Sequence, residues 1–139
     1  SRFAHFPLVS LHSHLSEGER LHHWQLAQAW AAKIVIGTRL SIFTPMPKLK
    51  LIIIDEEHDS SYKQQDSMRY HARDVAVVRG HMEDAVVVLG SATPSMESYY
   101  NARRGKYALL EMPSRIDNNN VRSALSQRPV PTWYWRSDV

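Results

Sequence analysis

The stretch LIIIDEEH, residues 51–58, decides the fold. Its first four residues are aliphatic with no polar alternation, which is typical of a strand buried on both faces of a parallel sheet. Asp55, Glu56, Glu57 and His58 follow at once. Because ligands of open parallel sheets bind beyond the carboxyl ends of the strands, we expect this acidic cluster at a binding edge.

Strands and helices alternate on both sides of this stretch. Strands are predicted over residues 9–11, 33–36, 51–54, 85–89 and 107–110, and helices over 16–31, 72–82 and 95–104. Ser16 and Glu19 have the spacing of a capping box at the first helix. This order predicts an α/β fold with a parallel sheet. We place the domain over residues 1–117 and expect an irregular, divergent tail over 118–139, where the hydrophobic periodicity stops.

The composition is that of a soluble globular protein, with 43% apolar and 22% charged residues. No apolar run approaches the ~18 residues of a membrane span. The chain has no cysteine, which excludes disulfides and thiolate metal sites within it. Its net charge of +3 is compatible with a nucleic-acid partner.

The acidic cluster predicts phosphoryl-transfer chemistry. A carboxylate such as Asp55 at a strand tip can hold a hydrated Mg²⁺. A second carboxylate such as Glu56 can take a proton from an attacking water, which suits transfer of a phosphoryl group to water. A solvated acidic turn is the alternative for an isolated Asp-Glu pair.

Three strand ends carry motifs that resemble a known class of motor protein. Residues 51–58 resemble the DExH box of superfamily 2 helicases, and residues 90–94, GSATP, resemble their motif III. Residues 37–39 resemble their Gly-Thr-Arg motif on the nucleic-acid path.

Two longer matches, DEEHDSSYKQQ at residues 55–65 and RYHARD at residues 69–74, are more specific. They resemble the primosomal protein N′ family, the PriA-type replication-restart DNA helicases of bacteria. The resemblance covers roughly residues 3–115. It implies a RecA-like parallel sheet with flanking helices, as part of an incomplete P-loop NTPase domain. It also implies a fragment of the first motor domain of a cytoplasmic, ATP-dependent 3′-to-5′ DNA helicase.

By this resemblance, Asp55 coordinates Mg²⁺ through water and Glu56 activates the hydrolytic water. His58 would couple the nucleotide site to the other motor lobe. Ser91 and Thr93 would relay the nucleotide state to the DNA path.

The resemblance also assigns DNA contacts. Thr38 and Arg39 would touch the DNA backbone. Residues 62–71 correspond to an aromatic-rich loop that senses single-stranded DNA. Residue types in and beside this loop suit that role, because tyrosines stack on bases and basic side chains neutralise phosphates. These residues are Tyr62, Lys63, Arg69, Tyr70 and Arg73. A solvated polar loop is the alternative.

The implied cofactors are ATP and Mg²⁺, with zinc expected only in a second motor domain. The implied partners are single-stranded or forked DNA, other primosome proteins and single-stranded DNA-binding proteins, with no membrane. A histidine metal site at His12, His14, His22 and His23 is a disfavoured alternative, because no acidic or cysteine ligand stands beside them.

The chain contains no Gly-x-x-x-x-Gly-Lys-Ser/Thr phosphate loop, since its one Gly-Lys pair, Gly105-Lys106, is followed by Tyr107. We therefore expect ATP hydrolysis by the isolated chain to be no faster than background. Two interpretations stay open: a helicase part that needs completion, and an inert product that binds single-stranded DNA weakly at most.

By the same resemblance, the phosphate-loop strand lies between the strands predicted over 85–89 and 107–110. Without it, we expect open sheet edges and self-association. A less favoured alternative is that the aromatic tail near Trp133 fills the gap, because Pro129 and Pro131 lack the backbone N–H that a ladder needs.

Overall fold

The computed structural model describes residues 5–64, 70–112 and 130–135. Its helices are α1 (Glu17–Gln28), α2 (Ala72–Glu83) and α3 (Met96–Arg103), with two 3₁₀ turns, η1 (Arg39–Phe43) and η2 (Ser60–Tyr62). Its strands are β1 (Leu8–Leu11), β2 (Ile34–Gly37), β3 (Leu51–Ile54), β4 (Lys63–Gln64), β5 (Tyr70–His71), β6 (Val86–Gly90), β7 (Ala108–Met112) and β8 (Val130–Trp135). All the strands and helices expected from the sequence are present near their predicted bounds.

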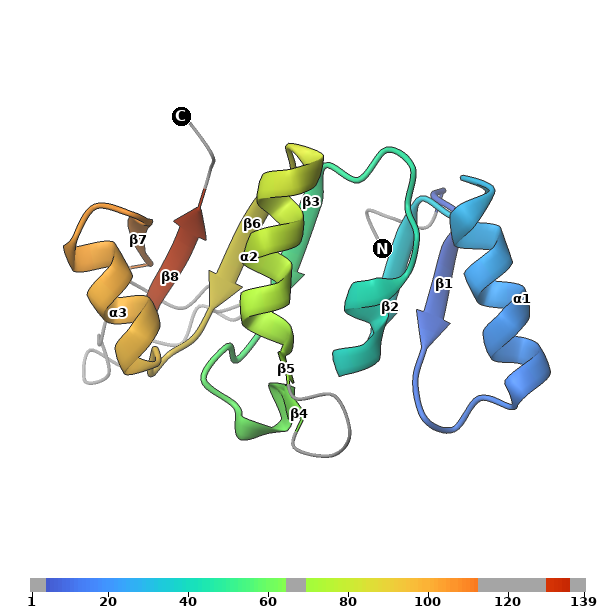
Figure 1. The fold of residues 1–139 in the computed structure, drawn as a ribbon, viewed down its shortest axis with the longest axis horizontal. Helices are drawn as coiled ribbons and strands as arrows, with labels where there is room; N and C mark the ends of the chain where they lie inside the picture. Colours follow the sequence, from blue (N-terminus) through green and yellow to red (C-terminus); the bar gives the residue numbers. More distant parts are fainter. Residues whose placement is uncertain (1–4, 65–69, 113–129, 136–139) are drawn as a thin grey trace, which may run out of the picture.

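The parallel pairs are β1 with β2 and β3 with β6. The strand order of the main sheet is β3-β6-β8-β7, while β1-β2 and the short antiparallel β4-β5 pair are separate. The β1, β3 and β6 arrows point to the same edge of the molecule (Figure 1). This arrangement is that of part of a RecA-like α/β domain, as the sequence predicted.

The core lies where α2 packs on β3 and β6. It is formed by Ile54, Ala76, Val87 and Leu89, which are all buried. Figure 1 shows α2 running across these two strands. On β3 the residues that alternate with this face, Leu51 and Ile53, are 50% and 65% exposed. The prediction that β3 is buried on both faces is therefore wrong for the described part of the chain.

The start of α1 is the predicted capping box. Ser16 Oγ accepts the Glu19 N–H at 3.3 Å, and the Glu19 carboxylate accepts the Ser16 N–H at 2.9 Å. The helix ends at Gln28 and not at residue 31, because Trp30 adopts a left-handed backbone with φ of 59°. The Lys33 ammonium group lies 4.0 Å from the centre of the Trp30 ring. No helix in the described residues has the length and apolarity to cross a membrane.

Part of the tail, which we predicted to be irregular, is a strand of the main sheet. Residues 130–135 form β8, which lies between β6 and β7 and is antiparallel to both. The alternative that we favoured less, in which the tail fills the gap, is the one in the structure. Pairing with β6 ends at Gly90↔Thr132, so Pro131 lies beyond that ladder, while on the other side it stands opposite Glu111 of β7. Pro129 lies outside the described residues.

Candidate functional site

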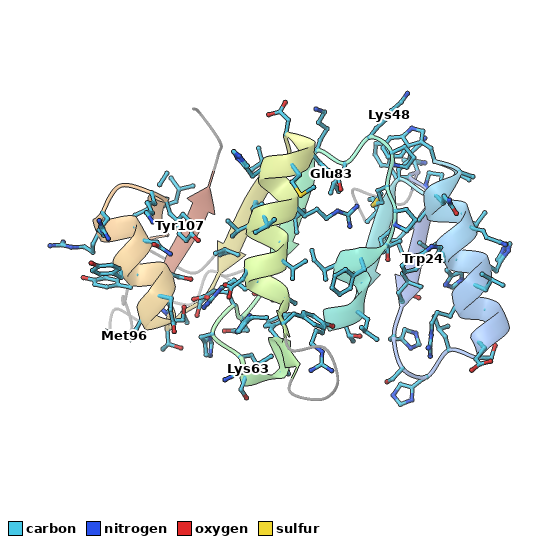
Figure 2. All side chains as sticks on the ribbon, in the orientation of Figure 1. Trp24, Lys48, Lys63, Glu83, Met96 and Tyr107 are labelled. Carbon is cyan, nitrogen blue, oxygen red and sulfur yellow. The ribbon has the colours of Figure 1, made fainter. Side chains whose placement is uncertain are left out.

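The predicted motifs after β3 and β6 meet because the two strands are hydrogen-bonded neighbours. Ile54 pairs with Leu89, so the next residues, Asp55 and Gly90, lie at neighbouring positions. The Glu57 N–H donates to the Gly90 carbonyl at 3.0 Å, which joins the two strand ends. In Figure 2, the labelled Lys63 and Met96 lie at this same edge, which we call the acidic edge.

The acidic loop turns sharply directly after β3. Glu56 has a φ of 48°, a left-handed conformation that side chains other than glycine rarely adopt. The Asp59 N–H donates to the Glu56 carbonyl at 2.8 Å, and the Glu56 N–H donates to Asp55 Oδ1 at 3.0 Å. The turn leaves the Asp55 and Glu56 side chains exposed at the edge.

His58 joins the acidic loop to the Ser-Ala-Thr segment. Its Nδ1 lies 2.6 Å from Ser91 Oγ, and its Nε2 lies 3.4 Å from Thr93 Oγ1. The Thr93 N–H donates to Ser91 Oγ at 3.0 Å. The Glu56 carboxylate lies 3.5 Å from His58 Nδ1. Four of the residues singled out in the sequence therefore form one contact group.

Tyr62 contacts the same loop from the segment that follows it. Its hydroxyl donates to the Asp55 carbonyl at 2.7 Å, and its ring packs against the core. Burial raises the pKa of Tyr62, and the negative charges of Asp55, Asp59 and Glu56 raise it further. The hydroxyl is thus held protonated as a donor to the loop.

Arg39 links the Gly-Thr-Arg segment to the residues beyond the acidic loop. Its Nη1 donates to the Ser61 carbonyl at 3.0 Å and the Lys63 carbonyl at 3.1 Å. Gly37 allows the preceding turn, because a Cβ there would lie 2.6 Å from the Leu11 carbonyl oxygen. Thr38 and Lys63 are exposed.

Arg73 was predicted to contact DNA, but the structure places it inside the protein. Its side chain is buried, and its Nη1 donates to Glu57 Oε2 at 3.2 Å and Ser95 Oγ at 2.7 Å. The guanidinium thus bonds groups inside the protein and is largely shielded from solvent. Tyr70 packs edge-on against Phe43, with ring centres 5.1 Å apart. Arg69 lies outside the described residues.

Sequence reasoning missed a second polar cluster behind the acidic loop, formed by Glu57 with Arg73, Ser95 and Ser98. The one usable signal was Ser95, which we predicted as a helix cap. It does cap α3, accepting the Ser98 N–H at 3.2 Å. In the described residues, the acidic edge included, no group of three or more histidine or acidic side chains could hold a metal ion.

A family model described as DEAD/DEAH box helicase matches residues 1–102. The chain belongs to the DEAD/DEAH box helicase family. Its matched region contains all the contacts of the acidic edge described above.

The chain is also similar to curated proteins named replication restart protein PriA. It is 51% identical over 111 residues to the Haemophilus influenzae protein, covering 80% of this chain and 15% of that one. It is 54% identical over 106 residues to the Chlamydia pneumoniae protein, covering 76% of this chain and 14% of that one. It is 46% identical over 108 residues to the Bacillus subtilis protein, covering 78% of this chain and 13% of that one. These matches confirm the resemblance predicted from the sequence. The chain spans about one-seventh of the length of these relatives.

The acidic edge has the right chemistry for a magnesium ion. Asp55 and Glu56 offer exposed carboxylate oxygens at a rigid strand end, and Mg²⁺ prefers oxygen ligands and keeps several waters. ATP and Mg²⁺ are the general cofactors of the helicase family. The donor set therefore fits the ion that the family implies.

Proposed function

We propose that this chain forms the metal- and water-handling side of the first motor domain of an ATP-dependent DNA helicase that acts in replication restart. The observation that supports this most directly is the contact group of Glu56, His58, Ser91 and Thr93 at the ends of β3 and β6. The names of the relatives support the restart role.

In this proposal Asp55 holds Mg²⁺ through water, and Glu56 accepts the proton of the attacking water. Bound Mg²⁺ would neutralise charge that develops on the transferred phosphoryl group. His58, held by Ser91 and Thr93, would keep Glu56 aligned and report the state of the nucleotide site. The role of His58 needs only short movements, because Glu56, Ser91 and Thr93 each lie within about 3.5 Å of its ring nitrogens.

Nucleotide hydrolysis needs a phosphate cradle as well, and this chain has no Gly-Lys-Ser/Thr loop. Positioning of the phosphates supplies most of the catalysis in such reactions. The isolated chain should therefore hydrolyse ATP no faster than background. A DNA-stimulated ATPase rate that disappears in Glu56→Gln would contradict this.

In the longer protein, the chain would act with a second, zinc-containing motor domain and unwind DNA in the 3′-to-5′ direction. Its partners would be forked or single-stranded DNA, primosome proteins and single-stranded DNA-binding proteins. For the chain by itself, weak single-stranded DNA binding is the second candidate activity. Exposed Lys63 beside Thr38 and Arg39 at the acidic edge favours it.

Fluorescence anisotropy with labelled single-stranded DNA tests the binding face. Lys63→Ala should weaken binding about twofold to fivefold and lower the slope of log K against log salt by about 1, as for one phosphate contact. The matched control is Lys48→Ala, since Lys48 is an exposed lysine at the opposite edge of the sheet (Figure 2). Equal losses in both variants, or affinity that does not change with salt, would contradict the proposed face.

A further inference from the structure

Glu57 is fully buried although it lies between two exposed or half-exposed residues of the acidic loop. Its carboxylate accepts four hydrogen bonds. Oε1 accepts from the Ser95 N–H at 2.7 Å, and Oε2 accepts from Ser95 Oγ, Ser98 Oγ and Arg73 Nη1 at 3.0, 2.9 and 3.2 Å. A buried carboxylate with this many donors is a structural element and not a solvated charge.

Arg73 supplies the opposite charge from the first turn of α2. Besides Glu57 and Ser95, it contacts Asp74, whose Oδ1 accepts from Nε at 3.0 Å, and Glu97, 3.8 Å away. Burial by itself would lower the pKa of Arg73, but its bonds to Asp74 and Glu57 outweigh this and raise it. The Arg73 guanidinium therefore stays charged, and its contacts with Glu57 and Ser95 tie the acidic loop to the starts of both α2 and α3.

The position of this pair along the chain matters for the exposed residues beside it. Glu56, immediately before Glu57, has the strained left-handed backbone. His58, immediately after it, contacts Ser91 and Thr93. Backbone strain of this kind persists only where surrounding contacts over-determine it. Glu56 itself bonds to Asp55 and Asp59, and the residue after it is fixed by the Glu57 carboxylate and by the Glu57 N–H bond to Gly90.

We propose that Glu57 and Arg73 are positioning residues of the acidic edge, which hold the Glu56 backbone and keep the His58 ring on Ser91. Their catalytic meaning rests on the function proposed above. The positioning itself can be measured without ATP or DNA, so that its failure and the failure of the proposed function are separate results.

The experiment compares Glu57→Gln, Arg73→Gln and the double variant of the 139-residue chain by NMR. Three signals are recorded: hydrogen exchange of the amide of residue 57, the nuclear Overhauser contact between His58 and Ser91, and exchange of the Val87 and Val88 amides as a measure of the intact sheet. Both single variants should speed exchange at residue 57 at least about tenfold and lose the His58–Ser91 contact, while Val87 and Val88 stay protected.

Arg79→Gln is the matched control. Arg79 lies on the same helix, pairs with Glu83 at 2.6 Å and donates to the distant carbonyl of Ile42. Its loss removes side-chain contacts of the same helix away from the acidic edge, and it should leave residue 57 and His58 unchanged.

The double variant separates positioning from simple charge compensation. Removing both charges leaves no uncompensated buried ion, so it should melt above either single variant. Its His58–Ser91 contact should nevertheless stay absent. Recovery of that contact together with the stability would overturn the proposal, as would single variants with an unchanged loop. If a single variant unfolds, Arg73→Lys decides, because it keeps the charge but cannot bond Asp74 and Glu57 from separate nitrogens as Arg73 does. Loss of its His58–Ser91 contact would support the proposal, and an unchanged contact would overturn it.

Discussion

The acidic edge and the part of the sheet formed by β6, β8 and β7 are held together in different ways. At the acidic edge, side chains far apart in sequence bond to one another, as His58 does with Ser91 and Glu57 with Ser95. In this part of the sheet, β8 is joined to both β6 and β7 by antiparallel backbone pairing. Side-chain bonds demand particular residues, whereas backbone pairing accepts any extended segment that can reach. The first region can therefore be identified from a motif, and the second cannot.

Removing β8 should disturb the molecule more than any single substitution. A chain that stops after residue 128 leaves β6 and β7 with unpaired edges on apolar strands, and such edges template association. We expect loss of cooperative melting and the appearance of oligomers in size-exclusion chromatography with light scattering. A chain that lacks only residues 136–139 is the control and should behave as the full chain does. A truncated chain that remains a monomer and melts cooperatively would show that β8 is dispensable.

Leu89 lies in the core between the two regions, so its substitution measures how much that core contributes to stability. It is fully buried, and its backbone pairs with Ile54 on one side and Trp133 on the other. Leu89→Ala should lower the free energy of unfolding by about 2–5 kcal/mol, the usual cost of a buried leucine cavity. Urea unfolding followed by circular dichroism measures it.

Met82→Ala is the control for this substitution. Met82 is 78% exposed on α2, so its truncation should change stability by less than about 0.5 kcal/mol. Similar losses in the two variants would mean that Leu89 does not lie in a packed core.

Much of the fold could be predicted because the strands and helices have strong local patterns. Residues 51–54 are entirely aliphatic, and Ser16 and Ser95 mark helix starts by their caps. The grouping of Glu56, His58, Ser91 and Thr93 followed from the rule that parallel strands end at one edge. These predictions needed only neighbours along the chain or a general property of sheets.

The wrong predictions concerned residues whose contacts are distant in sequence, and no local pattern shows such contacts. Arg73 lies in a polar stretch, where a basic side chain suggests a phosphate contact. Its partner in the structure, Glu57, stands 16 residues earlier, and no role was predicted for Glu57 from the sequence. The tail was misjudged because its prolines argued against a strand, and only the register shows that Pro131 lies beyond the β6 ladder. In both cases the tertiary fold outweighs the local preference.

The smallest expected effect concerns His71, which lies at the start of α2 next to Arg73. Its Nδ1 accepts the Arg73 N–H at 3.3 Å and so caps the helix. Burial lowers the pKa of His71, and the positive charge of Arg73 lowers it further, although Asp74, Glu57 and Glu97 oppose this. A protonated ring has no acceptor at Nδ1, so the cap exists only in the neutral form.

Because the folded state binds this proton less readily than the unfolded chain does, stability should fall as the pH drops through the ordinary histidine pKa of about 6.5. His71→Asn keeps a capping oxygen but does not titrate. The loss of stability between about pH 7.5 and about pH 5.5 should therefore be larger in the wild-type chain than in His71→Asn. The difference should be at most about 1 kcal/mol, the usual contribution of an N-cap. Urea unfolding of both chains at the two pH values measures it, and contributions from the other histidines cancel in the comparison. An identical pH dependence in the two chains would mean that the His71 cap does not respond to protonation.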